Sequence, residues 1–153
     1  MKLADLFSNF FNVRQELIDA VKGLTQEQLN WKPTGYANSI AGLLGHIAVC
    51  EYWWVTVLAM RKTQASEAEF SRFDNARTLT ECLSLLNETL ADMREYLERE
   101  EVEDWDQVFY ESKPHDLRVS KRWLIWHTIE HQARHRGQIF MLMRLQGLDV
   151  PNV

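Results

Sequence analysis

Histidine side chains at helical spacing give this sequence its clearest chemistry. His127, His131 and His135 follow one another at four-residue intervals. Residues four apart on an α-helix share a face, with Cβ atoms roughly 6 Å from each other. His131 and His135 are therefore spaced to chelate one metal ion. His46 lies in a second apolar segment and shares a face there with Leu43 and Cys50.

All three candidate ligands replace apolar residues on stripes that are expected to face the core. The inner stripe of the last helix is expected to contain the following residues: Leu124, His131, His135, Gln138, Leu142 and Leu145. A buried polar group is costly unless it is hydrogen-bonded or bound, and a shared metal ion would satisfy all three histidines. Three histidines with a fourth position open to water or substrate are typical of a reactive site.

The histidines also have plainer explanations. A single core-facing histidine is more often a hydrogen-bonded core residue than a ligand, and His-x-x-x-His pairs recur on helices that bind no metal. The pair is not a metalloprotease motif, because that motif needs a glutamate directly after its first histidine. Here Gln132 follows His131, while Glu130 precedes it and turns about 100° away.

Helical periodicity predicts four long helices that would position these residues. We expect them at about residues 2–22, 39–61, 78–99 and 120–146, with one or two further turns at 25–29. The segment 62–77 is polar and is expected to be a connection, and 101–119 is compatible with a short hairpin. The predicted fold is all-α, a four-helix bundle, in one domain covering residues 1–153.

Composition and charge narrow the function classes. The net charge is -5 and the pI is about 5.5, so the chain lacks the basic surface that nucleic-acid binding requires. Cys50 and Cys82 are the only cysteines and do not form a disulfide framework. No signal peptide is evident at the start, and the longest apolar run, 40–60, is interrupted by His46 and Glu51. We expect a cytoplasmic protein without a membrane anchor.

Two motifs resemble the DinB/YfiT-like family. The run 127–138, His-Thr-Ile-Glu-His-Gln-Ala-Arg-His-Arg-Gly-Gln, is similar to that family's motif, and Leu-Gly-His-Ile-Ala at 44–48 precedes a similar aromatic stretch at 52–54. The order of elements also agrees, so the resemblance spans nearly the whole chain.

The resemblance implies a dimeric four-helix bundle with a divalent ion, zinc or nickel, held by three histidines. His46, His131 and His135 match the family's ligand positions. Members of the family include S-transferases that use bacillithiol, mycothiol or glutathione, a maleylpyruvate isomerase, and proteins described as hydrolases. The resemblance therefore implies a small-molecule substrate and a low-molecular-weight thiol as cosubstrate.

Further residues are expected to surround this site. His127 could donate a hydrogen bond to a ligand histidine or pack at the edge of the bundle, and Gln138 could orient a ligand. Cys50 could line the metal pocket, although a small buried cysteine is the commoner explanation. Tryptophans on both histidine-bearing helices could form the wall of an apolar pocket or pack in the core.

Three functions remain compatible with the residues. The first is a metal-dependent enzyme, and the absence of an obvious general base favours thiol transfer over hydrolysis. The second is a non-catalytic metal-binding stress-response protein, whose metal shell would be closed by a fourth ligand such as Cys50. The third is a metal-free helical interaction module.

Overall fold

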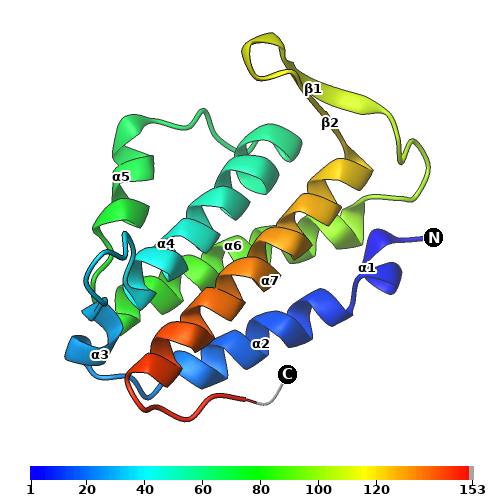
Figure 1. Ribbon diagram of the computed structural model, residues 1–153. Helices are drawn as coiled ribbons and strands as arrows, with labels where there is room; N and C mark the ends of the chain where they lie inside the picture. The colour runs from blue at the N-terminus through cyan, green and yellow to red at the C-terminus, as the bar shows by residue number, and fades with distance from the viewer. Residues whose placement is uncertain (152–153) are drawn as a thin grey trace.

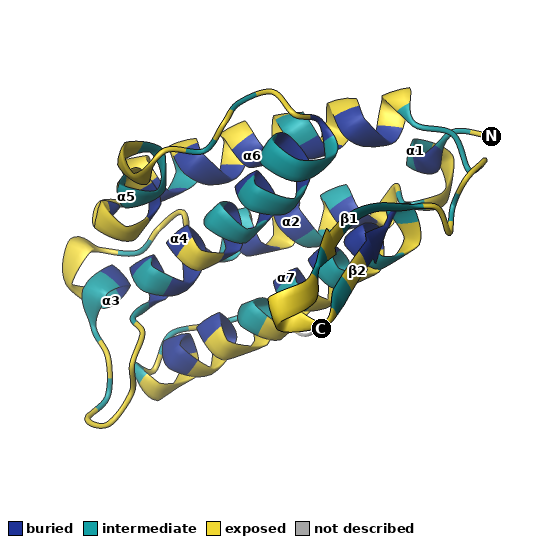
Figure 2. Cartoon of the chain, turned by 90° about the horizontal axis from the view of Figure 1, so that it is seen from above, coloured by how far each residue is buried: buried dark blue, intermediate teal, exposed yellow. Residues whose placement is uncertain are grey.

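Four long helical segments lie side by side in the computed structural model, which describes residues 1–151 (Figure 1). They are α2 (Asn9–Val21), α4 (Ile40–Glu51) with its continuation, α6 (Leu79–Arg99) and α7 (Lys121–Leu145). Buried residues follow their inward sides and exposed residues their outer sides (Figure 2). The expected all-α four-helix bundle is confirmed, with a small two-stranded sheet at one end.

The N-terminal helix is shorter than the periodicity predicted. It is divided into α1 (Leu3–Leu6) and α2, with a break at residues 7–8. The short helix α3 (Gln26–Asn30) follows where one or two turns were expected. It begins at Thr25, whose hydroxyl accepts a hydrogen bond from the Gln28 amide at 3.2 Å, while the Gln28 side chain accepts one from the Thr25 amide.

The histidine-bearing helix α4 begins at Ser39, whose hydroxyl accepts a hydrogen bond from the Gly42 amide. It continues as a π-helix, η1 (Tyr52–Ala59), in which each turn holds more residues than an α-turn. Together they form the apolar segment Ile40–Ala59, with a mean hydropathy of 1.3, which is long and apolar enough to cross a membrane. No membrane-spanning run was expected here, because His46 and Glu51 interrupt the apolar segment. Because 61% of it is buried inside the bundle, we account for it as a core helix.

The polar segment 62–77, expected to be a connection, contains another helix. Helix α5 (Glu67–Asn75) begins with a capping box in which Ser66 and Glu69 satisfy each other's backbone amides. Its carboxyl end lies against α4 at Gly45, where an added Cβ would be 2.6 Å from the Phe73 carbonyl oxygen. Gly45 therefore permits the close approach of α5 to α4.

The hairpin expected within 101–119 is present, and it leads directly into α7. Strands β1 (Val108–Ser112) and β2 (Leu117–Ser120) pair antiparallel, with a register shift between Val108 and Tyr110. The turn between them includes the 3₁₀ segment η2 (Lys113–His115). Ser120 ends the second strand and caps α7 by accepting a hydrogen bond from the Trp123 amide at 3.2 Å. The far end of α7 is followed by Gly147 at φ +73°, a left-handed conformation that glycine adopts without strain.

Candidate metal centre

The three candidate ligands come from two neighbouring helices of the bundle. His46 lies in the middle of α4, and His131 and His135 lie one turn apart on α7, which packs beside α4 (Figure 1). His46 is exposed, and the other two are partly buried. The site is therefore at the surface, in the seam between these two helices.

The close contacts between these imidazole rings are made by their Nε2 atoms. Nε2 of His131 lies 3.1 Å from Nε2 of His46 and 3.1 Å from Nε2 of His135. The ring centroids of His46 and His135 are 4.7 Å apart. Nitrogen ligands at about 2.0–2.1 Å from a tetrahedral zinc ion are about 3.3 Å from each other. The spacing of His131 from each of the other two rings is therefore compatible with a shared divalent ion.

Gln138 sets the tautomer of one ligand. Nδ1 of His135 donates a hydrogen bond to Oε1 of Gln138 at 2.5 Å. A neutral imidazole has one N–H, so the Nε2 atom of His135 keeps its lone pair, directed at the other two rings. The expectation that Gln138 could orient a ligand agrees with this contact.

The electrostatics of the cluster favour neutral imidazoles. Burial lowers the pKa of His131 to about 3, and the neighbouring His135 and His46 add to this effect. Burial and His135 also lower the pKa of His46, whereas the nearby Asp74 carboxylate acts in the opposite direction. Metal ions bind the neutral form of histidine, so the cluster needs no proton removed from His131 at neutral pH.

The histidines do not occupy the core stripe that the sequence predicted. Leu124 and Leu142 are buried as expected, but Gln138 and Leu145 are exposed. The buried face of α7 instead includes Gln132, which is 1% exposed. The candidate ligands lie at the boundary between the buried and the exposed faces of the helices. A partly apolar face at this boundary has the same helical periodicity as a fully buried face, so the sequence pattern does not distinguish them.

Comparisons with known proteins show the family and the fold. The family model described as the DinB family matches residues 1–153. The chain belongs to the DinB family. A solved structure of a DinB-like protein, YjoA from Bacillus subtilis, is 17% identical and superposes with a TM-score of 0.68. The match covers 95% of this chain and 94% of YjoA, and at this identity it shows the shared fold. No curated protein matches the chain.

Cys50 offers a further ligand atom at the site of this DinB protein. Its sulfur lies 3.9 Å from Nε2 of His46, and the ligand atoms of His46, Cys50 and His131 all lie within 4.8 Å of one another. Burial raises the pKa of the Cys50 thiol to about 11, and the Glu51 charge adds to this effect. The side chain therefore lines the site as a neutral thiol.

An aromatic wall flanks the cluster toward the hairpin. The His127 ring stacks on Trp123 with centroids 4.5 Å apart, and Trp54 packs against both rings. His127 is also 5.6 Å from the His131 ring centroid. Within residues 1–151, His127 makes no hydrogen bond to a candidate ligand. Its contacts are packing contacts at the edge of the bundle.

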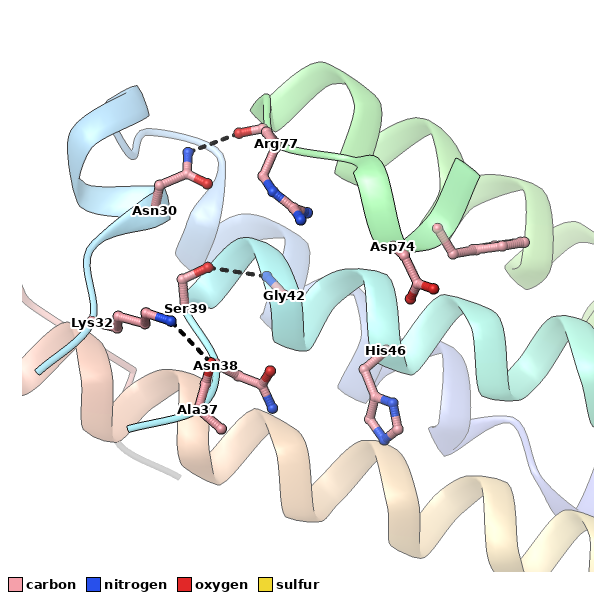
Figure 3. A pocket seen from close by; sticks show the side chains of 10 residues that line it. Asn30, Lys32, Ala37, Asn38, Ser39, Gly42, His46, Asp74 and Arg77 are labelled. Atoms are coloured by element: carbon pink, nitrogen blue, oxygen red, sulfur yellow. Dashed lines mark hydrogen bonds between the residues drawn. The ribbon is translucent and has the colours of Figure 1, made fainter. Parts of the chain in front are cut away.

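A polar cavity of about 390 Å³ opens on the other side of His46 (Figure 3). Its charged lining residues are Lys32, Asp74 and Arg77, and Asn30 and Asn38 add amides. Sequence reasoning missed all five, because they come from separate segments whose proximity no local spacing reveals. One of them, Asp74, lies on α5 in the segment that was expected to be a connection.

A buried polar network behind the site was also missed. The Arg14 guanidinium is fully buried, is paired with the Glu51 carboxylate, and donates to Gln132 Oε1 at 2.6 Å. The Thr89 hydroxyl donates to the other Glu51 oxygen at 2.9 Å. The sequence held a usable signal, because Arg14 interrupts the apolar stripe of its helix between Phe10 and Leu17.

Proposed function

We propose that this DinB-family protein is a metal-dependent enzyme whose divalent ion, zinc or nickel, is held by His46, His131 and His135. The observation that carries the proposal is the position of His131 Nε2, which lies 3.1 Å from the Nε2 atoms of both His46 and His135. Imidazole suits either ion. Members of the family are commonly metal-associated, which supports the same assignment. We place the protein in the cytoplasm.

Thiol transfer to a small molecule is the reaction that we favour. A divalent ion in this position supplies a Lewis acid that lowers the pKa of a bound thiol or water. The chain's own residues leave room for a ligand, because His46 is exposed and a cavity adjoins it. Trp54, Trp123 and His127 form the aromatic wall that flanks the cluster toward the hairpin. In this proposal a low-molecular-weight thiol is the cosubstrate and the nucleophile.

Hydrolysis is a second candidate, and one observation supports it. Asp74 lines the cavity beside His46, so a carboxylate is available there to accept a proton from water. The sequence had suggested no general base. Replacing Asp74 with Asn would abolish a hydrolytic activity that depends on this base, whereas a thiolate nucleophile needs no such group.

A non-catalytic metal-binding role in stress response is the alternative that Cys50 favours. With the sulfur 3.9 Å from His46 Nε2, a small rotation would let Cys50 complete a closed four-ligand shell. Such a site would fasten α4 to α7 and leave no position for substrate. A Cys50→Ser variant that loses metal would favour this structural role, whereas unchanged metal content would favour an open site.

Metal analysis tests the site itself. We would measure zinc and nickel by elemental analysis in untagged protein purified without added metal. His131→Ala would be the test variant and His115→Ala, in the exposed turn of the hairpin, the matched control. We expect about one ion per chain in wild type and control, and none in His131→Ala. Wild-type protein that stays metal-free after incubation with both ions would refute the proposal.

We also propose that the protein forms a homodimer through the outer face of α7. Trp126, Met141 and Leu145 are 71%, 37% and 55% exposed, and they lie within about 100° of one another around the helix. An exposed apolar face of this kind is typical of an interface. Sedimentation should give a dimer for wild type and a monomer for Trp126→Glu, with the exposed substitution Arg118→Glu as the control.

A further inference from the structure

The cavity beside His46 contains two cations that are not paired with carboxylates. Lys32 Nζ donates to the Ala37 carbonyl at 3.3 Å, and Arg77 Nη1 donates to the Ala76 carbonyl at 2.8 Å. Within residues 1–151 neither cation forms a salt bridge, although the charge of Arg77 acts on Glu81, whose carboxylate accepts a hydrogen bond from the Arg77 backbone amide. Unpaired cations that line one concave surface are suited to bind an anionic group.

The charges are distributed unevenly along the cavity. Lys32 and Arg77 lie near Ser39, where α4 begins, whereas Asp74 lies near His46 (Figure 3). Ser39 and His46 are seven residues apart, which corresponds to about 10 Å along an α-helix. The cationic end is therefore separated from the histidines by the length of a small molecule, and the negative charge of Asp74 opposes an anion at the histidine end.

The net charge of the lining indicates which anion fits. Lys32, Arg77 and Asp74 together leave one positive charge in the lining, which a single carboxylate neutralises. A phosphate group carries nearly two negative charges at neutral pH and would leave the lining overcompensated. The planar guanidinium of Arg77 can also pair with both oxygens of a carboxylate.

We propose that this cavity binds the carboxylate end of a small substrate or cosubstrate, with Lys32 and Arg77 as the binding residues. The other end of that molecule then lies at His46, where the reaction would occur. The placement of the reactive end at His46 rests on the proposed function, whereas the binding of the carboxylate does not. The cavity thus selects ligands in which a carboxylate and the reactive group are separated by a short chain.

The test compares an acid with its uncharged amide. We would titrate protein loaded with one equivalent of Co²⁺ with 6-mercaptohexanoate and with 6-mercaptohexanamide, following the thiolate absorption bands of cobalt. The variants are the double substitution Lys32→Gln with Arg77→Gln, and Arg118→Gln, on the hairpin, as an exposed control. Circular dichroism would check that each variant folds.

We expect wild type and the Arg118→Gln control to bind the acid about tenfold more tightly than the amide. In the double variant, acid and amide should bind within about twofold of each other, because the cations that distinguish them are gone. Equal binding of acid and amide by wild type would overturn the proposal, as would a preference for the acid that survives in the double variant.

The two proposals can fail separately. If cobalt is not bound, or neither thiol changes its spectrum, the proposed function fails. The cavity is then tested on metal-free protein by titrating hexanoate and following the Asn30 and Asn38 side-chain amides by nuclear magnetic resonance. Shifts of these signals in wild type and not in the double variant would sustain the carboxylate site, and no shift in wild type would overturn it.

Discussion

At the scale of single residues, the contact between Gln138 and His135 gives a direct prediction. Replacing Gln138 with Leu removes the acceptor that holds the His135 N–H at Nδ1. We expect metal affinity to fall about 10- to 100-fold, as is usual when a partner of a metal-binding histidine is lost. Competition with a chromophoric chelator would measure the affinity.

The control for this change is Gln15→Leu, an exposed glutamine-to-leucine substitution on α2. It should leave the affinity within about twofold of wild type, because it lies away from the ligands. Equal affinities for Gln138→Leu and wild type would mean that the hydrogen bond does not orient the ligand.

Sequence spacing was enough to find His131 and His135 but not their surroundings. Two residues four apart on a helix must lie near each other, so this pair could be predicted from local geometry alone. Lys32 and Arg77, which line the cavity beside His46, come together only after separate segments of the chain have packed. The burial of the histidines was also misjudged, because a stripe at the rim has the same periodicity as one in the core.

At the scale of secondary-structure elements, the π-helix explains one difference from the sequence prediction. At 3.6 residues per turn, Trp54 and Leu58 would share a face with Leu43 and Cys50. In the structure Val55 and Met60 are buried instead, and the Met60 amide donates to the Val55 carbonyl at 2.8 Å. A wider turn changes which residues face inward, and periodicity at 3.6 residues cannot register that change.

The approach of α5 to α4 gives a prediction about stability. Gly45→Ala would place a methyl group 2.6 Å from the Phe73 carbonyl oxygen, a backbone atom that cannot rotate away. We expect unfolding free energy to fall by about 1–3 kcal/mol, measured by urea denaturation. Gly23→Ala is the control, since its added Cβ has no atom within 4 Å. Equal stability of both variants would show that α5 can move away without cost.

The buried network of Arg14, Glu51, Thr89 and Gln132 connects four helices. Substitutions within it should therefore have non-additive effects on the unfolding free energy. Arg14→Met would leave the buried Glu51 carboxylate unpaired, with an expected cost of about 3–5 kcal/mol in unfolding free energy. Adding Glu51→Met should restore part of that loss, because no uncompensated charge remains buried. Chemical denaturation of both single variants and the double variant would measure the coupling, and strictly additive losses would contradict it.

At the scale of the whole molecule, the amphipathic pattern was sufficient for the bundle. Four apolar helices of this length have few ways to bury their faces other than against one another. Helix α5 escaped prediction because its single buried side chain, Phe73, gives little periodic signal. Its start, however, carried a readable capping pattern in Ser66 and Glu69.

The histidine cluster should make the metal-free protein sensitive to acid. Burial lowers the pKa of His131 to about 3 and also lowers those of His46 and His127. In the unfolded chain histidines titrate near pH 6.5, so below that pH the unfolded state binds more protons. Stability is therefore fully present above about pH 6.5 and is lost as the pH falls toward the folded pKa.

Urea denaturation in the presence of a chelator at pH 7 and pH 5 would measure this loss. The decrease between the two pH values should be smaller in His131→Leu than in wild type, since one of the protonating groups is removed. Identical decreases in both proteins would show that His131 does not contribute to the acid sensitivity.

The stack of Trp123 on His127 also gives the protein an optical reporter of its own. Because His127 lies between this indole and His131, an ion bound by the three histidines would be close to the Trp123 ring. Open-shell ions such as nickel and cobalt quench nearby indole emission, whereas zinc, with a filled shell, does not. Occupancy of the site can thus be followed by tryptophan fluorescence, and the identity of the ion distinguished, without attaching a label.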